Sequence, residues 1–404
     1  MSPFANSDVS VMISHVTRPL RLPLALLSLI LASFLQTSVA PRAQTTAPAA
    51  NSLLPGPKPS DVSADWKHLV GIYGEEKGRS ITILERDRKL FLITPPLCTG
   101  NKLEFPFEYL KTKESLSGDV IGVPIHLTFM ADSSGQVTQL KTNIEVHASS
   151  GSAPNGHDSC RAVDTYFFLR ADAGSDPTHF NHVHPAQPVS ELREKALKLS
   201  PPAEPGPFRK PDLVELATLD PAIHLDIRYA TANNFLSTPV YTEARAFMQR
   251  PAAEALLRVL HELQPLDYGL LIHDAYRPWY VTKIFWDATP SEGKIFVADP
   301  QKGSKHNRGC AVDLTLYDLA TGRPVEMPGL YDEMSPRSFP NFPGGTSLQR
   351  WHRDLLRRAM ESEGFAVNED EWWHFDYNDW KQYGILNVPF EKIAVSGQPA
   401  AVSH

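Results

Sequence analysis

Short runs of alternating hydrophobic and polar residues dominate the chain between residues 66 and 172. Four runs show this period of two most clearly, and each is predicted to be a strand: residues 80–84, 89–93, 125–129 and 166–169. Successive side chains of a strand point to opposite faces of its sheet, so this alternation indicates half-buried strands. Clusters of small and polar residues separate the runs, as turns do. We therefore expect residues 66–172 to form a small antiparallel β-sandwich or barrel, an accessory domain to which the sequence assigns no chemistry.

Helical and strand periods are mixed between residues 212 and 393. Helices are predicted at residues 251–263, 278–285 and 348–363, with Pro251 starting the first, Ser347 capping the last and Gly364 ending it. Strands are predicted at residues 223–229, 270–274, 311–317 and 373–377. This mixture predicts an α+β domain with a mostly antiparallel sheet and flanking helices.

The first 43 residues have the pattern of an export signal. Two arginines precede the uncharged run from Leu22 to Leu35, which is too short to span a bilayer comfortably. Small residues follow the run, but Pro41 would hinder cleavage, so an uncleaved anchor is the alternative. We therefore expect the chain to be exported, as a periplasmic or secreted protein.

Three further segments are predicted to connect or end the domains. Residues 44–65 are rich in Pro, Ala, Ser and Thr, and are expected to be a disordered linker. Residues 173–211 are expected to hold a helix at 190–199, capped by a serine, and then a Pro-rich linker. Residues 394–404 are expected to be a disordered tail.

Composition narrows the class of protein. The chain has 404 residues, enough for two domains, and its formal net charge of −7 argues against a nucleic-acid partner, which usually requires a basic surface. There are three cysteines. Cys98 and Cys160 could form a disulfide in an oxidising compartment, or both could be free thiols, and Cys310 would be left over.

Two short segments of the second domain carry the residues of a hydrolytic metal site. The first contains His306 and Asp313, and the second contains Glu371 and His374. Catalytic zinc takes three protein ligands from the His, Asp and Glu repertoire and leaves a position for water. A neighbouring carboxylate can then accept the proton of that water. Because Glu371 and His374 are three residues apart, they would face opposite sides of a regular strand, so Glu371 is expected on a turn or bulge before it.

A third segment supplies a cation. Arg277 follows a predicted buried strand, in a position where loops often carry function. Its guanidinium could stabilise the oxyanion that develops at an attacked carbonyl. The alternative is a surface salt bridge to Asp274, which would contribute little to stability.

Four segments together resemble a known family. In chain order they are residues 226–231 (DIRYAT), 274–278 (DAYRP), 304–317 (SKHNRGCAVDLTLY) and 371–374 (EWWH). Their order and spacing resemble those of the zinc D-alanyl-D-alanine dipeptidases related to the vancomycin-resistance enzyme. The resemblance covers residues 212–393, about the full size of that catalytic domain.

The resemblance implies a role for individual residues. One zinc ion per chain would be held by His306, Asp313 and His374. Glu371 would be the catalytic base, and Arg277 would stabilise the transition state. The residues around the dipeptide would be Tyr229, Asp274, Ser304 and Asp332. Cys310 stands where the family pattern has a small residue, and a nucleophilic thiol there would need its own base.

These observations predict an exported zinc metallopeptidase that hydrolyses D-alanyl-D-alanine or related small D-amino-acid peptides in cell-wall peptide turnover. One alternative is a D,D-carboxypeptidase acting on longer peptidoglycan stem peptides, and the segments at residues 235–241 and 292–303 could narrow the site against them. The other alternative is a non-catalytic, zinc-stabilised cell-wall binding module, although a structural zinc site is normally closed by a fourth protein ligand.

Overall fold

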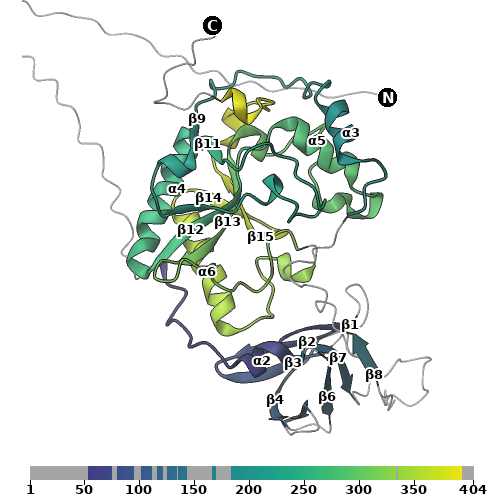
Figure 1. Ribbon diagram of the computed structural model, residues 1–404. Coiled ribbons are helices and arrows are strands. Elements are labelled where there is room, and N and C mark those ends of the chain that lie inside the picture. Colours follow the sequence, from purple (N-terminus) through teal and green to yellow (C-terminus); the bar gives the residue numbers. More distant parts are fainter. Residues whose placement is uncertain are drawn as a thin grey trace, which may run out of the picture. The chain divides into compact units, whose positions relative to one another are not determined.

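The computed structural model (Figure 1) describes residues 53–74, 80–94, 102–111, 116–121, 125–133, 135–142, 166–169, 183–333 and 335–393. Its mixture of helices and mainly antiparallel sheets agrees with the predicted α+β class. The export signal, the C-terminal tail, Cys98 and Cys160 lie outside the described residues. Within those residues, no helix is long and apolar enough to cross a membrane.

The N-terminal sheet has eight strands, each antiparallel to the next along the chain. The strands are β1 (Gly71–Gly74), β2 (Ser80–Arg86), β3 (Lys89–Ile93), β4 (Glu104–Lys111), β5 (Leu116–Val120), β6 (His126–Ala131), β7 (Val137–Thr142) and β8 (Tyr166–Leu169). The four predicted strands are confirmed as β2, β3, β6 and β8. A short helix, α2 (Ala64–Leu69), precedes the sheet. Buried side chains such as Tyr73, Ile83 and Leu92 fill the core of this sheet, as in barrels too small to enclose a cavity.

A second sheet carries the residues of interest. It has five strands in the order β10-β12-β13-β15-β14, antiparallel except for the parallel pair β10 and β12. The strands are β10 (Ile223–Leu225), β12 (Tyr268–Asp274), β13 (Ala311–Asp318), β14 (Phe365–Asn368) and β15 (Glu371–Tyr377). A separate antiparallel pair consists of β9 (Leu213–Glu215) and β11 (Phe247–Gln249).

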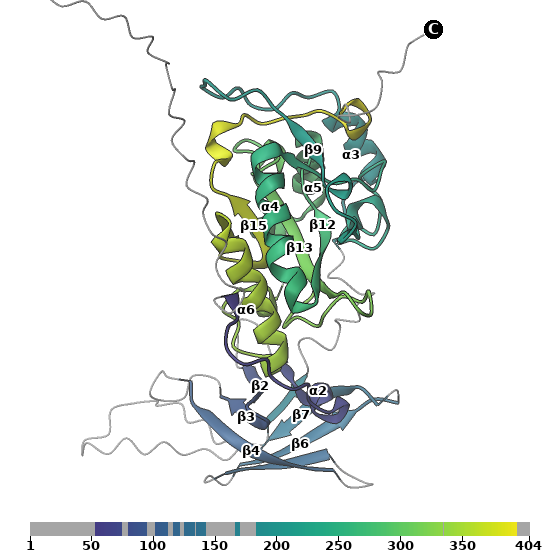
Figure 2. The same ribbon diagram turned by 90° about the vertical axis from the view of Figure 1, so that its left-hand side faces the viewer.

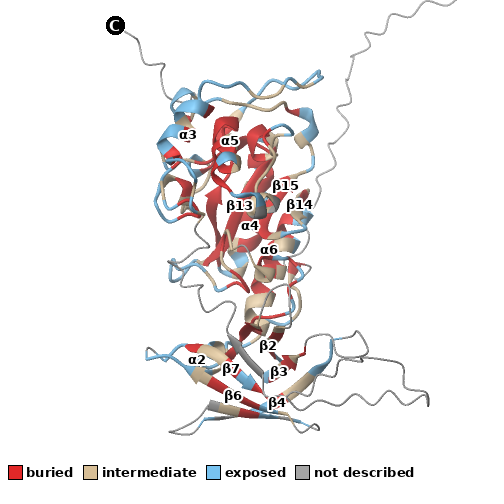
Figure 3. Cartoon of the chain, turned by 90° about the vertical axis from the view of Figure 1, so that its right-hand side faces the viewer, coloured by how far each residue is buried: buried red, intermediate tan, exposed pale blue. Residues whose placement is uncertain are grey.

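Helices bury one face of this five-stranded sheet. The helices of this region are α3 (Val189–Ala196), α4 (Arg250–Leu263), α5 (Trp279–Ala288) and α6 (Ser347–Ser362). Figure 2 shows α4 and α6 side by side over the strands, and α3 packs on α5. Figure 3 shows that burial is concentrated in the strands and in α4 and α5. On β13 the apolar residues Val312, Leu314 and Leu316 belong to this core. Because side chains alternate along a strand, Asp313 lies on the other face.

Most predicted elements of this region are confirmed, and the differences are local. The strand predicted at 223–229 ends at Leu225, and a 3-10 turn (Arg228–Ala230) follows. The turn is favoured because the Tyr229 carbonyl accepts hydrogen bonds from the N–H groups of both Val240 and Tyr241, at 2.8 and 2.9 Å. This pairing holds Tyr229 in the turn instead of in a continuing strand.

Two predicted helix caps are wrong. Helix α6 is capped by Thr346, one residue before the predicted Ser347, because the Thr346 side chain and Gln349 form a reciprocal capping box. Gly364 follows the end of this helix with a left-handed φ of 88°, as predicted. Helix α3 begins at Val189 with Pro188 before it, so the predicted serine cap is absent there.

Part of the predicted disordered linker is packed. Leu53 is buried in the same hydrophobic core as α4 and α6, and the Trp351 indole N–H donates a 3.0 Å hydrogen bond to the Gly56 carbonyl. The Pro-rich composition of residues 44–65 concealed one apolar pair, Leu53 and Leu54, which can bury enough surface to order the chain around it.

Candidate active site

Three side chains of the five-stranded sheet region meet in a cluster that can hold a metal ion. His306, Asp313 and His374 are buried, and their ligand atoms all lie within 4.8 Å of one another. Asp313 Oδ1 is 3.3 Å from His306 Nε2 and 3.1 Å from His374 Nδ1, and among the described residues no donor is well directed for a hydrogen bond to it. A buried carboxylate oxygen without a donor is costly unless a cation compensates it. Two imidazole nitrogens and one carboxylate oxygen are a donor set that suits zinc.

Strand pairing explains why these residues meet. Asp313 on β13 is the direct cross-strand partner of His374 on β15, so both side chains project from the same face of the sheet. His306 lies in a 3-10 turn (His306–Arg308) that ends at Gly309, where φ is 70°. A Cβ atom at Gly309 would lie 2.7 Å from Leu213 Cδ2. The left-handed backbone therefore favours glycine at the turn that leads into β13, and a larger residue would also have to displace the Leu213 side chain.

Each candidate ligand is oriented by a further group. His306 Nδ1 lies 2.7 Å from the Ala275 carbonyl oxygen, and His374 Nε2 lies 3.0 Å from Asp376 Oδ1. The Tyr331 hydroxyl donates to Asp313 Oδ2 at 3.2 Å. Such outer contacts fix the tautomer and the direction of a metal-binding imidazole. The Asp313 Oδ1 atom and one nitrogen of each imidazole are thereby left for a metal ion.

In the absence of a metal ion, a proton on His374 compensates the negative charge of Asp313. Burial raises the pKa of Asp313, but the nearby imidazoles of His306 and His374 outweigh burial and hold it well below its usual range. Burial lowers the pKa of His374, but its contacts with the carboxylates of Asp313 and Asp376 outweigh burial and raise it to about 10. A metal ion entering the site would therefore displace a proton, as is general for imidazole ligands.

Glu371 lies beside this cluster. It is the first residue of β15, where the pairing with β14 shifts register between Val367 and Asn368. The expected irregularity is present, but Glu371 begins the strand and does not precede it. Its Oε2 atom lies 3.5 Å from His374 Nδ1 and accepts a 2.9 Å hydrogen bond from the Asn368 amide. Burial raises the pKa of Glu371, which suits a carboxylate that must accept and release a proton near neutral pH.

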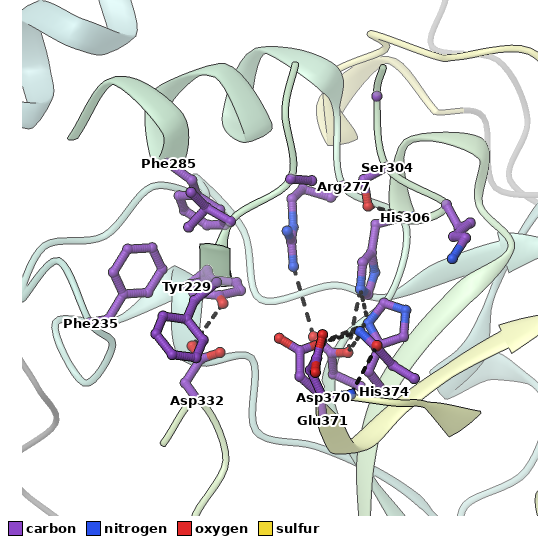
Figure 4. Close-up of a pocket in the computed structure, with 17 residues that line it drawn as sticks. Tyr229, Phe235, Arg277, Phe285, Ser304, His306, Asp332, Asp370, Glu371 and His374 are labelled. Carbon is purple, nitrogen blue, oxygen red and sulfur yellow. Dashed lines mark hydrogen bonds and ion pairs between the residues drawn. The ribbon is translucent and has the colours of Figure 1, made fainter. Parts of the chain in front are cut away.

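Arg277 is a buried cation on the same pocket (Figure 4). Its guanidinium carbon lies 5.3 Å from the centre of the Tyr229 ring and 4.9 Å from that of Phe285. One terminal nitrogen is 2.7 Å from Asp274 Oδ2 and 3.8 Å from Asp313 Oδ2. The pair with Asp274 therefore exists, but it is a buried pair and not the surface salt bridge considered above.

Asp274 does not lie on the pocket wall, where the sequence predicts a substrate contact. Its Oδ1 atom accepts hydrogen bonds from the Tyr241 hydroxyl at 2.7 Å and the Ala275 N–H at 2.9 Å, and Oδ2 accepts from Arg277. Both oxygens are thus occupied, only 1% of the residue is exposed, and it does not line the pocket. Asp274 therefore contacts Arg277 behind the pocket wall, and the structure does not place it among the pocket-lining residues where a substrate contact is predicted.

All the other predicted site residues line one pocket of about 290 Å³. This volume is just below the roughly 300–1,000 Å³ typical of ligand pockets, so it suits a small substrate. Both segments expected to narrow the site contribute to its wall, Phe235 from the first and Phe296, Val297, Ala298 and Gly303 from the second.

Tyr229, Ser304 and Asp332 form a polar part of the pocket wall. The Tyr229 hydroxyl donates to Asp332 Oδ2 at 2.7 Å, as the close-up shows (Figure 4). Burial raises the pKa of Asp332 to about 8. The Ser304 hydroxyl oxygen accepts a 3.2 Å hydrogen bond from the His306 N–H. These groups can meet the polar ends of a small ligand.

Sequence reasoning missed four residues that support the site. Tyr331, Asn368 and Asp376 each contact a candidate ligand or Glu371 directly, as described above. Asn307 is fully buried, and its amide donates to the Arg277 carbonyl and to Thr282 Oγ1, each at 2.8 Å. Of these, only Asp376 had a usable signal, since it follows His374 by two residues and so shares its strand face.

Cys310 is separate from the pocket. The residue is a buried free cysteine, and burial raises the pKa of its thiol. A nucleophilic thiol needs the opposite, a lowered pKa or an adjacent base. The environment of Cys310 is therefore that of a small, packed side chain and not that of a nucleophile.

Comparisons with known proteins point to one family. The family model described as D-ala-D-ala dipeptidase matches residues 209–396. A D-alanyl-D-alanine dipeptidase of Escherichia coli (strain K12) is 34% identical over 179 residues, which cover 44% of this chain and 91% of that protein. A D-alanyl-D-alanine dipeptidase of Enterococcus faecalis (strain ATCC 700802 / V583) is 35% identical over 185 residues, 40% of this chain and 90% of that protein. The matched range contains every residue of the pocket.

Proposed function

Since the chain belongs to the D-Ala-D-Ala dipeptidase family, we propose that it hydrolyses the dipeptide D-alanyl-D-alanine in this pocket, with zinc as its metal. One observation carries the proposal: a carboxylate, Glu371, and a cation, Arg277, line the same small pocket as three candidate metal ligands. A zinc ion held by His306, Asp313 and His374 would polarise the scissile carbonyl and acidify the attacking water.

Glu371 is the group that moves the proton in this proposal. One of its oxygens accepts a proton as the water oxygen bonds to the carbonyl carbon. The same proton then passes to the leaving nitrogen as the peptide C–N bond breaks, so that two alanine molecules are released. The hydrogen bond from Asn368 fixes the Oε2 atom of Glu371 during both transfers.

Arg277 meets the negative charge that develops on the carbonyl oxygen. Its charge is permanent, and its direction is set by Asp274 before substrate binds. A preorganised cation stabilises the transition state without reorganising at the moment of reaction. The rings of Tyr229 and Phe285 beside the guanidinium help to exclude water.

The two ends of the dipeptide carry opposite charges, and the pocket offers polar groups for both. Asp332, held by the Tyr229 hydroxyl, is proposed to accept the ammonium group. Ser304 is proposed to donate its hydroxyl proton to the carboxylate. The aromatic and apolar wall formed by Phe235, Phe296 and Val297 leaves little room for a longer peptide, which favours the dipeptide over a stem peptide.

We also propose that the chain is exported and acts in cell-wall peptide turnover. The support is the uncharged run from Leu22 to Leu35 after two arginines. An exported dipeptidase would have no access to cytoplasmic precursor pools, so wall turnover or scavenging fits this location better than antibiotic resistance.

The test uses the full chain and the variant Glu371→Ala. We expect the variant to lose dipeptide turnover while it keeps about one zinc ion per chain, because Glu371 is proposed as base and not as ligand. Loss of zinc together with turnover would make Glu371 structural. The wild-type chain should cleave D-alanyl-D-alanine faster than L-alanyl-L-alanine and faster than a pentapeptide ending in D-alanyl-D-alanine. Stoichiometric zinc with no cleavage of any of these peptides would refute the proposal.

A further inference from the structure

On the Nε2 side of His374, two charged side chains form a chain of contacts: Asp376, which is buried, and Lys305, which also lines the pocket. Asp376 Oδ1 lies 3.0 Å from His374 Nε2, and Asp376 Oδ2 lies 2.8 Å from Lys305 Nζ. Asp376 is 9% exposed, so water competes weakly for its oxygens. Lys305 directly precedes His306, and Asp376 follows His374 by two residues on β15. The ion pair therefore ties the loop that carries one candidate ligand to the strand that carries another.

We infer that Asp376 and Lys305 are positioning residues for His374 and set how tightly the site holds its metal. This inference rests on the metal site of the proposed function. Asp376 accepts the Nε2–H of His374, which leaves the Nδ1 lone pair directed at Asp313 and His306. A carboxylate partner also makes the imidazole a stronger donor to a metal ion. Lys305 occupies the second oxygen of Asp376, so that the first remains aimed at the imidazole.

A second lysine provides a matched control. Lys305 Nζ lies 5.6 Å from the centre of the Trp380 ring, and Lys381 Nζ lies 5.4 Å from the same ring. Within the described part of the chain, Asp376 is ion-paired with Lys305 and not with Lys381. The two lysines thus share an aromatic neighbour and a charge, but only Lys305 reaches the carboxylate behind His374.

The experiment measures the zinc dissociation constant of the full chain by competition with a chromophoric chelator, without substrate. We expect Asp376→Ala to weaken zinc binding by about 10- to 100-fold, the range found for such outer contacts. Asp376→Asn keeps the size and one acceptor oxygen but loses the charge, and should weaken binding less. Lys305→Met should also weaken it less than Asp376→Ala. Lys381→Met should bind zinc like the wild type.

Three outcomes would overturn the inference. The first is wild-type zinc affinity in Asp376→Asn and Lys305→Met. The second is an equal loss in Lys381→Met, which would indicate a general charge effect. The third is an undiminished effect of Lys305→Met in the Asp376→Asn background, since Lys305 must act through Asp376. Because these measurements need no turnover, a chain that binds zinc but cleaves nothing would refute the proposed function and leave this inference standing.

Two further measurements distinguish an effect of the Asp376–Lys305 pair on the metal site from an effect on the fold. Thermal unfolding of each variant with and without zinc should show a smaller zinc-dependent rise than in the wild type, in addition to any loss that the broken contacts cause in the metal-free protein. The visible spectrum of the cobalt-substituted protein should shift in Asp376→Asn and Lys305→Met, as the geometry of His374 changes. An unchanged cobalt spectrum with a lowered unfolding temperature would assign the pair to the fold and not to the metal.

Discussion

Asp274 holds the Arg277 guanidinium at 2.7 Å, and both side chains are buried, with 1% and 10% of them exposed. The carboxylate is itself fixed by the Tyr241 hydroxyl and the Ala275 N–H. The cation on the pocket wall is therefore one end of a rigid buried pair. Stability and turnover should both depend on it.

Arg277→Met tests this dependence. We expect kcat to fall by about 10²- to 10³-fold, as when a preorganised oxyanion donor is lost. The free energy of unfolding should fall by about 3–5 kcal/mol, because Asp274 is left buried without its partner. Both are measurable by steady-state kinetics and denaturant unfolding. The double variant Arg277→Met, Asp274→Asn should recover stability but not turnover, and recovered turnover would exclude the proposed role.

Asp332 should make the stability of the metal-free protein depend on pH. Burial raises its pKa to about 8, so between about pH 4 and pH 8 the unfolded chain releases a proton that the folded chain retains. Its contribution to stability is thus complete below the unfolded pKa and is lost as the pH rises toward 8. Asp332→Asn should therefore be more stable than the wild type at pH 7.5, by more than about 1.4 kcal/mol, the equivalent of one pKa unit.

Denaturant unfolding at two pH values checks this prediction. Near pH 4 the difference between Asp332→Asn and the wild type should disappear. Asp370→Asn, which replaces an exposed carboxylate of the same pocket, is the control for the removal of one pocket charge. A stability difference of Asp332→Asn that is the same at both pH values would contradict the assignment.

Removal of the metal ion should lower the free energy of unfolding by an amount that depends on the zinc concentration before its removal. A ligand bound only by the folded chain, at 1,000 times its dissociation constant, stabilises by about 4 kcal/mol. We expect excess zinc to raise the unfolding temperature of the chelated protein, and we expect His374→Ala to abolish most of this rise. An equal rise in the variant would mean that zinc binds elsewhere.

Asn307 should be among the most sensitive positions outside the ligand set. Its side chain accepts from the Ser304 N–H and donates to the Arg277 carbonyl and to Thr282. Asn307→Ala leaves these groups without their partner, and each such loss costs about 1–3 kcal/mol. Unfolding midpoints should show a large loss for Asn307→Ala and none for the exposed Asn233→Ala. A small loss would mean that water replaces the amide.

Cys310 should be dispensable for turnover. Its thiol is buried, its pKa is raised, and it lies outside the pocket. Cys310→Ala should keep kcat within about threefold of the wild type, because no step needs a thiol. The folded protein should also resist thiol reagents until it unfolds. Loss of turnover in a folded, zinc-loaded Cys310→Ala variant would restore the nucleophilic alternative.

The parts of the site that could be predicted are those encoded within a few residues. His306, Gly309 and Asp313 belong to one turn followed by one strand, and Glu371 and His374 lie within four residues. Their residue types and spacing therefore indicate the cluster without knowledge of the fold. Helix α4, with its helical spacing of apolar residues, and strand β12, a short apolar run, are predicted for the same reason.

The parts that could not be predicted depend on which atoms meet after folding. The family resemblance implies a substrate contact for Asp274, but a matching motif does not show that both of its oxygens already accept hydrogen bonds within the protein. Tyr331 and Asn368 reach the site only through tertiary contacts and a shifted register. The cap of α6 was misplaced by one residue because Thr346 and Ser347 are both competent caps, and only Thr346 completes the reciprocal pair with Gln349.

The direct pairing of Asp313 with His374 has a consequence for assembly of the sheet. A strand that slips by one residue turns every side chain to the opposite face. In such a slipped arrangement of β13 and β15, the carboxylate and the imidazole would point away from each other, and the donor set would not exist. A metal ion that needs both side chains would therefore bind only those chains in which β13 and β15 are correctly aligned. Zinc present during refolding should enrich chains whose strands are correctly aligned.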